Sequence, residues 1–342
     1  MKRKRILSFC LALILTVSLS VSVFAFEFPL LFVDVKKDQW YYSYVKEAYE
    51  QKITTGTTPF TFEPNGTVTR EMFVTMLIRS AGIDMQYYND LDDESMQFFQ
   101  MLLADGDQTA DPAFELRGGR WYSPYVAYAI ALGMTNGVGN GRFGLGQPIT
   151  REQMATMAAR FIDLRPHVQL KQAKAPASAF SDANQISDWA REAAETMRLA
   201  GVMQGDESHR MNPQSTATRA DAAAVILRLR DATERASFIP AGTRSFLLRD
   251  ATNLTGGMPA EYPITKSADV AKLVTMLDNM PIKKEIAIPP HGGWAYLIHF
   301  NDAEGEFLTG YQFSEDWIMV NGSMLCTTDD YFKPLIQMMQ TK

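Results

Sequence analysis

Three tryptophans recur along the chain, and each is followed at fixed distances by a glycine and by a Thr-Arg pair. The tryptophans are Trp40, Trp121 and Trp189. The glycine lies 16 residues after each of them, at Gly56, Gly137 and Gly205, and the arginine lies 30 residues after, at Arg70, Arg151 and Arg219. Successive copies are 81 and 68 residues apart, so the spacing is constant within each copy but not between copies. We interpret the pattern as an internal repeat of three units.

The Thr-Arg pairs can be explained in two ways. Threonine is a good helix N-cap when Glu, Gln or Asp follows three residues later, as Gln153 and Asp221 do but Met72 does not. Capping does not explain the arginine, because a cation at the first helical position opposes the helix dipole by about 0.3–1 kcal/mol. An unfavourable residue kept in three copies favours a binding role, and a guanidinium at a helix start suits a carboxylate or phosphate. A purely structural arginine is the alternative.

The tryptophans also have two interpretations. A tryptophan at a helix start is commonly a core residue, but a flat ring beside an anion-binding arginine can also stack on a sugar. The glycine-rich stretch 137–141 is no phosphate loop, because no strand precedes it and no Lys-Ser/Thr follows it.

Each unit is predicted to fold as helix, loop, helix. After Trp121 the apolar residues recur at helical spacing, and Gly133 and Gly137 then end that helix. Thr150 opens a second helix with an apolar face that includes Met154 and Phe161. One helix pair buries too little apolar surface to be stable alone, so we expect the three pairs to share one core.

The first 25 residues have the pattern of a secretory signal peptide. Four cations at 2–5 precede an apolar run to Phe24, and Ala25 offers a cleavage site. A membrane anchor is the alternative, since the run is nearly long enough to span a bilayer. Removing this segment, which holds four cations and no acid, changes the formal charge from −6 to −10. An acidic exported chain argues against nucleic acid and anionic membranes as partners.

The cysteines indicate that no disulfide holds the chain. Cys10 lies in the signal segment, so Cys326 alone remains. Ordinary hydrophobic cores must therefore stabilise the fold.

The repeats resemble the S-layer homology family over about residues 30–230. Unit one matches through Phe32-Val33-Asp34-Val35, Trp40 and Thr69-Arg70-Glu71. Unit two matches through Trp121, Gly133, Gly137, Phe143 and Thr150-Arg151-Glu152-Gln153. Unit three matches through Phe180-Ser181-Asp182, Trp189, Gly201, Gly205 and Thr218-Arg219-Ala220-Asp221.

This resemblance implies a pseudo-threefold, three-pronged helical domain with one helix of each unit in a central bundle. It also implies binding of an anionic secondary cell wall polysaccharide, often pyruvylated, in grooves between the prongs. The implied binding residues are Asp34, Trp40, Gly56, Arg70, Trp121, Gly137, Arg151, Asp182, Trp189, Gly205 and Arg219. The chain would then be a secreted cell-wall or S-layer protein without a cofactor or metal, free of the membrane after signal cleavage.

The units depart from the family pattern in ways that predict unequal sites. Unit two has Phe114-Glu115-Leu116 where Phe-x-Asp-Val is expected, and so lacks the early acid. Unit one has Lys52 where the others have Gly133 and Gly201. Between units one and two, residues 96–103 predict an extra helix. The acids at 90–94 lack an EF-hand pattern, which favours a solvated helix start over a calcium site.

The region after residue 240 lacks the repeat and predicts an α+β unit with an antiparallel sheet. Predicted strands are 245–248, 284–288, 294–300, 307–313 and 317–324, and predicted helices are 267–280 and 329–339. His291 and His299 lie eight residues apart, a spacing that favours surface histidines over a metal site. Cys326 has no sequence-adjacent base, so we expect a small buried apolar residue.

The predicted organisation is a signal peptide at 1–25, repeat units at 30–84, 114–166 and 178–232, a linker at 85–113 and a C-terminal domain at 240–342. The leading hypothesis is a non-enzymatic wall anchor that displays this C-terminal domain. One alternative is a wall-bound enzyme, such as a glycan hydrolase, with its activity in the C-terminal domain. The other is a surface module whose C-terminal domain captures a protein partner through a sheet edge.

Overall fold

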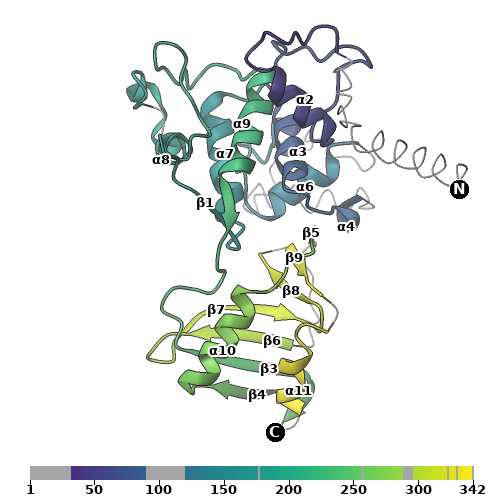
Figure 1. The fold of residues 1–342 in the computed structure, drawn as a ribbon, viewed down its shortest axis with the longest axis vertical. Helices are drawn as coiled ribbons and strands as arrows, with labels where there is room; N and C mark the ends of the chain where they lie inside the picture. The colour runs from purple at the N-terminus through teal and green to yellow at the C-terminus, as the bar shows by residue number, and fades with distance from the viewer. Residues whose placement is uncertain are drawn as a thin grey trace, which may run out of the picture.

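The computed structural model describes residues 32–89, 120–175, 178–255, 258–287, 296–321, 323–328 and 330–340. A helical half formed by the repeat units lies above a half built on one sheet (Figure 1). Each half has its own cluster of buried apolar side chains. The chain is therefore helical in its repeat region and α+β in its C-terminal region, as the sequence predicts.

Each repeat unit contributes two helices to the helical half. The pairs are α2 (Tyr42–Glu50) with α3 (Arg70–Ser80), α6 (Ser123–Ala131) with α7 (Arg151–Asp163), and α8 (Arg191–Leu199) with α9 (Arg219–Ala232). A short helix, α4 (Gln86–Asn89), follows the first pair. The second helix of every pair begins at the repeated arginine, directly after its threonine.

The capping of these second helices depends on the residue three positions after each N-cap threonine. Thr150 with Gln153 and Thr218 with Asp221 form reciprocal capping boxes. Thr69 forms no such box. Its buried hydroxyl has no hydrogen-bond partner within the described structure, and the Met72 side chain has no polar group that could accept from the Thr69 N–H.

The second helices form the centre of the helical half. Helices α3, α7 and α9 bury most of their residues, whereas α2 buries only Val45 and Ala48, and α8 only Ala194 and Met197. Helix α3 contacts both α7 and α9. The helices that carry the Thr-Arg pairs therefore pack together. Helices α2 and α8 lie outside them, whereas α6, the first helix of unit two, is itself largely buried.

A cycle of backbone hydrogen bonds joins the three units just before their second helices. Val68 N donates to Ala217 O (3.1 Å), Ala217 N to Ile149 O (2.9 Å), and Ile149 N to Val68 O (3.1 Å). Each segment thus donates to one neighbouring unit and accepts from the other. The cycle fixes the backbone position of the repeated arginine, which lies two residues after the bonded residue in every unit.

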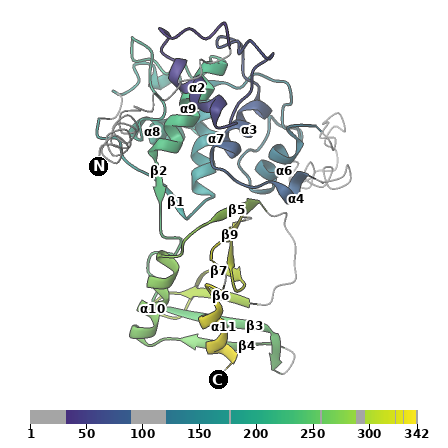
Figure 2. The ribbon, with the colours of Figure 1, turned by 45° about the vertical axis from the view of Figure 1, so that its right-hand side comes forward.

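The C-terminal half is a seven-stranded antiparallel sheet within the described residues, in the order β4-β3-β6-β7-β8-β9-β5. Its strands are β3 (Ser245–Thr255), β4 (Met258–Ile264), β5 (Lys284–Ala287), β6 (Tyr296–Asn301), β7 (Phe307–Phe313), β8 (Trp317–Val320) and β9 (Ser323–Cys326). Helices α10 (Ser267–Asp278) and α11 (Lys333–Gln340) cover one face, where Leu277 and Ile336 join the sheet's buried side chains (Figure 2).

The C-terminal half differs from its prediction in several places, and strand β3 runs to Thr255 rather than ending at residue 248. Strand β4 was not predicted because Pro259 and Pro263 argue against a strand, although an edge strand such as β4 tolerates them. The predicted strand 317–324 is two strands, since Asn321 turns the chain with a φ of 44°. The last helix begins at Lys333 rather than at residue 329.

Edge strand β5 joins the sheet to the helical half. Asp84 pairs with it through Asp84 N to Glu285 O (2.8 Å) and Ala287 N to Asp84 O (2.8 Å). The Glu285 carboxylate is buried between Arg165 (2.6 Å) and His167 (3.2 Å). Tyr128 Oη and Ser323 Oγ add a buried bond of 2.8 Å. A two-stranded ribbon of β1 (Val168–Leu170) and β2 (Thr233–Arg235) lies where the chain leaves the repeats.

Several predictions fall outside the described residues. They are the signal peptide at 1–25, the helix at 96–103, the acids at 90–94, the Glu115 region and His291. Across the part of the chain that is described, none of the helices combines the length and the apolar character that crossing a membrane requires. The domain boundaries stay predictions.

Candidate functional site

Two cavities in the helical half are each built from all three repeat units. The first, which we name the Gly205 groove, has a volume of about 870 Å³ and is lined by Trp40 of unit one, Arg151 of unit two and Gly205 of unit three. The second, the Gly56 groove, has a volume of about 350 Å³ and is lined by Trp121, Arg219 and Gly56. The sequence markers that recur within a unit thus come together between units.

One wall of each groove is the same face of a second helix. In the Gly56 groove it is Met72, Thr75, Met76 and Arg79 of α3. In the Gly205 groove it is Asp221, Ala224, Val225 and Arg228 of α9. These positions correspond one to one in the repeat, and their spacing of three and four residues places them on one helix face. The two grooves are therefore built from corresponding positions of the repeat and differ in the side chains at those positions.

The repeated tryptophans lie on the surface rather than in the core. Trp40, Trp121 and Trp189 are 56%, 52% and 56% exposed. Trp40 packs edge-on against Tyr41 (5.4 Å between ring centres), and Trp121 against Tyr122 in the same way (5.3 Å). The core interpretation is wrong for all three. An exposed, braced ring at the rim of a groove is a platform on which a sugar ring can stack.

The repeated glycines leave no room for a side chain. A Cβ atom would lie 2.3 Å from Thr58 O at Gly56, 2.2 Å from Arg142 O at Gly137 and 2.8 Å from the His209 carbonyl carbon at Gly205. Each glycine precedes a turn closed by one backbone bond, as in Thr57 N to Thr61 O (2.9 Å). Gly137 also has a positive φ of 69°. The glycines thus shape the loops that border the grooves.

The Thr-Arg arginines cross from one unit into the next. Arg70 donates to Phe143 O (2.8 Å) and Thr135 Oγ1 (3.0 Å) of unit two. Arg219 donates to Phe62 O and Thr55 O of unit one, both at 2.7 Å.

Arg151 reaches unit three in the same way. It donates to Met211 O (2.7 Å), Gln204 O (3.0 Å) and the Asp221 carboxylate (3.2 Å). Taken together, the three arginines link the units in a closed cycle.

Burial distinguishes Arg70 and Arg219 from free anion binders, whereas the Arg151 side chain is 14% exposed. Arg70 is 2% exposed and Arg219 8%. Removal from water lowers the pKa of Arg70 to about 10 and also lowers the pKa of Arg219. Their guanidinium groups lie over Phe143 (5.1 Å) and Phe62 (4.4 Å). These contacts favour the structural interpretation of the arginines, and their role in ligand binding stays a prediction.

The early acids hold the same loops from the other side. Asp34 accepts from Phe62 N (2.9 Å) and Glu63 N (2.7 Å), and Asp182 accepts from Met211 N (2.7 Å) and Asn212 N (2.8 Å). Phe62 and Met211 therefore each have the N–H bound by an acid of their own unit and the C=O bound by an arginine of the preceding unit. Asp34 and Asp182 position the groove loops, and direct sugar contact by either stays a prediction.

Two groove residues were missed by the sequence analysis. Arg79 Nε donates to Tyr125 Oη (3.1 Å), and Arg228 Nε donates to Tyr44 Oη (3.1 Å). Each arginine lies nine residues after its Thr-Arg arginine, and each tyrosine lies four residues after a repeated tryptophan. This second spacing could have identified them.

The described residues hold no group of three or more His, Cys, Asp or Glu side chains that could bind a metal ion. In the sheet, His299 packs edge-on against Phe307 (5.0 Å between ring centres). Cys326 lies at the end of β9 and is half-buried, and burial raises the pKa of its thiol.

Comparison with known proteins identifies the repeats. The S-layer homology domain model matches residues 31–71, 118–155 and 179–223. The chain is 31% identical over 199 residues to an endoglucanase of Bacillus sp. (strain KSM-635), a match that covers 58% of this chain and 18% of that protein. It is 32% identical over 207 residues to an amylopullulanase of Thermoanaerobacterium thermosulfurigenes, a match that covers 60% of this chain and 10% of that protein.

An S-layer protein of Bacillus thuringiensis subsp. finitimus is 27% identical over 197 residues, covering 58% of this chain and 21% of that protein. The chain thus matches about a fifth or less of the length of these three relatives. The matched length fits the helical half of the chain. Three S-layer homology domains, the units that anchor proteins to the cell wall, therefore form the repeat region of this secreted cell-surface protein.

Proposed function

We propose that the chain anchors itself non-covalently to the cell wall by binding an anionic secondary cell wall polysaccharide in the grooves between its repeat units. The observation that carries this proposal is the composition of the two grooves. Each combines an exposed tryptophan, a glycine-shaped loop and at least two arginines, and all three units contribute to it. Aromatic platforms and guanidinium groups suit the two chemical features of an acidic glycan, its sugar faces and its anionic groups.

We further infer that the three units are related by a pseudo-threefold axis. The cycle of Val68, Ile149 and Ala217 backbone bonds supports this arrangement, as does the cycle of arginines that each cross into the next unit. Such an axis relates the two described grooves and implies a third, between Arg70, Gly137 and Trp189. Its occupancy by a glycan is part of the proposal.

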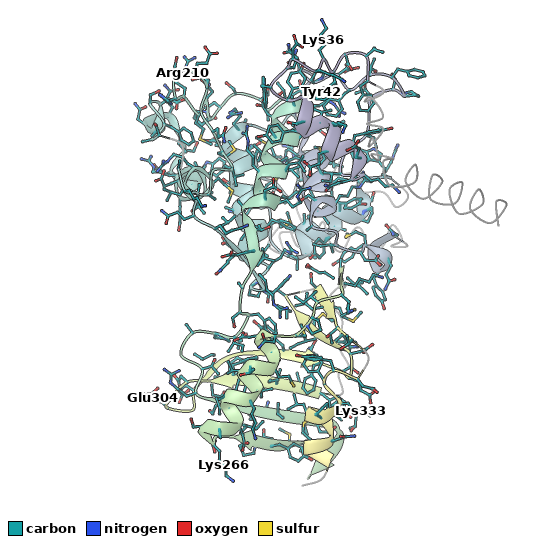
Figure 3. The ribbon with its side chains drawn as sticks, viewed as in Figure 1. Lys36, Tyr42, Arg210, Lys266, Glu304 and Lys333 are labelled. Carbon is teal, nitrogen blue, oxygen red and sulfur yellow. The ribbon has the colours of Figure 1, made fainter. Side chains whose placement is uncertain are left out.

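The C-terminal half is proposed to be displayed rather than to bind the wall. Figure 3 places Arg210, whose side chain borders the Gly205 groove, at the end of the helical half remote from Lys266 and Glu304 of the C-terminal half. A wall polymer in this groove would leave the sheet directed away from it. We infer that this half is not an enzyme, and a glycan-hydrolysis assay of the full chain on wall fragments tests that inference.

Sedimentation with purified walls tests the proposed function. The full chain without its signal segment should sediment with walls that keep their secondary polysaccharide, and should stay in solution once that polymer has been extracted. Salt should weaken the binding, because ionic contacts at an open groove are screened. Equal binding to extracted walls would contradict the proposal and would direct attention to peptidoglycan itself.

A further inference from the structure

Arg79 and Arg228 differ from the Thr-Arg arginines in what their guanidinium groups are free to bind. Each is half-buried and ends the helix face that forms the groove wall. Only Nε is held, by the hydroxyl of Tyr125 for Arg79 and of Tyr44 for Arg228. The guanidinium carbons lie 5.0 and 4.9 Å from the centres of these tyrosine rings. Two arginines from different units are thus held in the same way.

This arrangement leaves the terminal nitrogens available. Within the described residues, neither Arg79 nor Arg228 forms an ion pair, and no hydrogen bond of their Nη atoms is present. A guanidinium stacked on an aromatic ring and fixed through Nε presents its two Nη groups as a preorganised fork for a carboxylate or phosphate. By contrast, the Thr-Arg arginines already donate to at least two acceptors each.

The two grooves differ in the charge that surrounds this fork. None of the described residues that line the Gly56 groove is acidic, and both Arg79 and Arg219 face it. The Gly205 groove has Arg151, Arg210 and Arg228, but Asp206, Glu207 and Asp221 also line it. Position 72 carries methionine where unit three has Asp221, so the Gly56 groove is the more favourable environment for an anion.

Unit two offers a natural control. Arg160 occupies the corresponding position of α7, but Ala193 stands where the other units have Tyr44 and Tyr125. Arg160 instead donates to Asn136 Oδ1 (3.4 Å). It has no ring to hold it across a groove and is directed to a loop of its own unit.

We propose that Arg79 and Arg228, each held by a tyrosine of the neighbouring unit, bind the anionic substituents of the glycan, and that the Gly56 groove binds them more tightly. The proposal rests on the proposed function and adds to it the residues that bind the negatively charged groups of the glycan. The Thr-Arg arginines then act as positioning residues that fix the loops opposite this fork.

Wall-binding isotherms of three matched variants test this proposal. The full chain and its Arg79→Gln, Arg228→Gln and Arg160→Gln variants would be titrated with wall fragments that carry a carboxylate-bearing secondary polysaccharide. Parallel titrations would use the same fragments with their carboxylates amidated. Arg79→Gln should weaken binding by about tenfold or more, Arg228→Gln by less, and Arg160→Gln by under about twofold. Arg79→Lys should recover only part of the loss, because it restores charge but not the fork.

Amidation should lower the affinity of the wild-type chain and leave that of an Arg79→Gln/Arg228→Gln double variant nearly unchanged. Melting temperatures within about 2 °C of wild type would show that the variants fold. Wild-type affinity in both single variants, or an equal loss in Arg160→Gln, would overturn the proposal while wall binding stood. Failure of the wild-type chain to bind intact fragments would instead refute the proposed function.

Discussion

The two halves of the molecule use charge in different ways. In the helical half, Arg70 and Arg219 are buried and bonded to carbonyl groups of neighbouring units. In the sheet, the Arg249–Glu261 pair lies on the surface, with the side chains 35% and 50% exposed. A single helix pair cannot enclose a hydrophobic core of its own, so polar groups must set how the three pairs align with one another. A sheet needs only one continuous apolar face to pack against its helices.

The boundary between the two halves resembles the helical half in burying its charged side chains. Glu285 belongs to the edge strand of the sheet, yet its carboxylate is buried against Arg165 and His167. Ala287 of the same strand joins the apolar cluster of the repeats. We therefore expect substitutions at buried charges to change stability strongly and those at surface pairs to change it weakly.

The largest effect is expected for Glu285→Ala. Removing one partner of a buried pair leaves the Arg165 charge uncompensated, which typically costs about 3–5 kcal/mol. The sheet should then separate from the repeats, seen as faster proteolysis between residues 232 and 244 and as two melting transitions in calorimetry. Glu261→Ala is the matched control at a surface pair and should cost no more than about 1 kcal/mol. A single unchanged transition in Glu285→Ala would contradict the role given to this cluster.

Arg70→Ala should destabilise the helical half by roughly 2–4 kcal/mol. The substitution leaves Phe143 O without its buried donor, at about 1–3 kcal/mol, and removes one of the two donors to Thr135 Oγ1, which still accepts from Gly137 N. Chemical unfolding followed by tryptophan fluorescence of the repeat region measures the loss. The helix-dipole argument from sequence predicts no loss at all, because it counts the cation as unfavourable. A melting curve equal to wild type would favour that argument and remove Arg70 from the inter-unit contacts.

Acid should weaken the boundary between the halves. The hydrogen bond from His167 and the charge of Arg165 lower the pKa of Glu285 to about 2, despite the opposing effect of burial. Since the folded pKa lies below the ordinary value of 4.5, Glu285 stabilises the docked state above about pH 4.5, and this contribution is lost as pH falls towards 2. Proteolytic susceptibility of the 232–244 segment with an acid-active protease should rise over that range. The rise should be absent in Glu285→Gln, which is already uncharged.

A small gain is expected from Lys52→Gly. Lys52 has a φ of 58°, in the left-handed region that Gly133 (73°) and Gly201 (74°) occupy at the same position of the other units. A side chain there costs about 1–2 kcal/mol, partly offset by the greater freedom of glycine in the unfolded chain. The free energy of unfolding should rise by about 0.5–1 kcal/mol. Gly133→Lys is the reciprocal variant and should lower it by a similar amount.

The sequence predicted the repeat and its elements well, because Trp, Gly and Thr-Arg keep constant spacing within each unit. It also predicted the sites where Thr150 and Thr218 would cap helices, since capping depends on residues three positions apart. It did not predict that Arg70, Arg151 and Arg219 leave their own units. That outcome depends on how the units pack, and local spacing does not encode which neighbour an arginine meets.

The misassignments in the sheet have local causes. Pro259 argues against a strand, so β4 was not predicted. Proline is tolerated there only because β4 lies at the edge of the sheet, and which strand lies at the edge depends on the whole sheet. The single strand predicted over 317–324 overlooked Asn321, one of the residue types that adopts a positive φ readily. In the repeats, exposure of Trp40 was left open, because a tryptophan at a helix start suits either a core or a surface.

The central claim, that the grooves between units bind the wall polymer, is tested most directly by calorimetric titration of the isolated secondary polysaccharide. The full chain would be compared with its Trp40→Ala and Trp121→Ala variants, each of which removes the exposed ring of one described groove. Phe307→Ala, which removes a ring that is 60% exposed on the sheet, is the control. Each tryptophan variant should lose about tenfold in affinity at its groove, as expected for an aromatic contact of more than 1 kcal/mol, while Phe307→Ala binds as wild type. Undiminished binding in both tryptophan variants would contradict the claim.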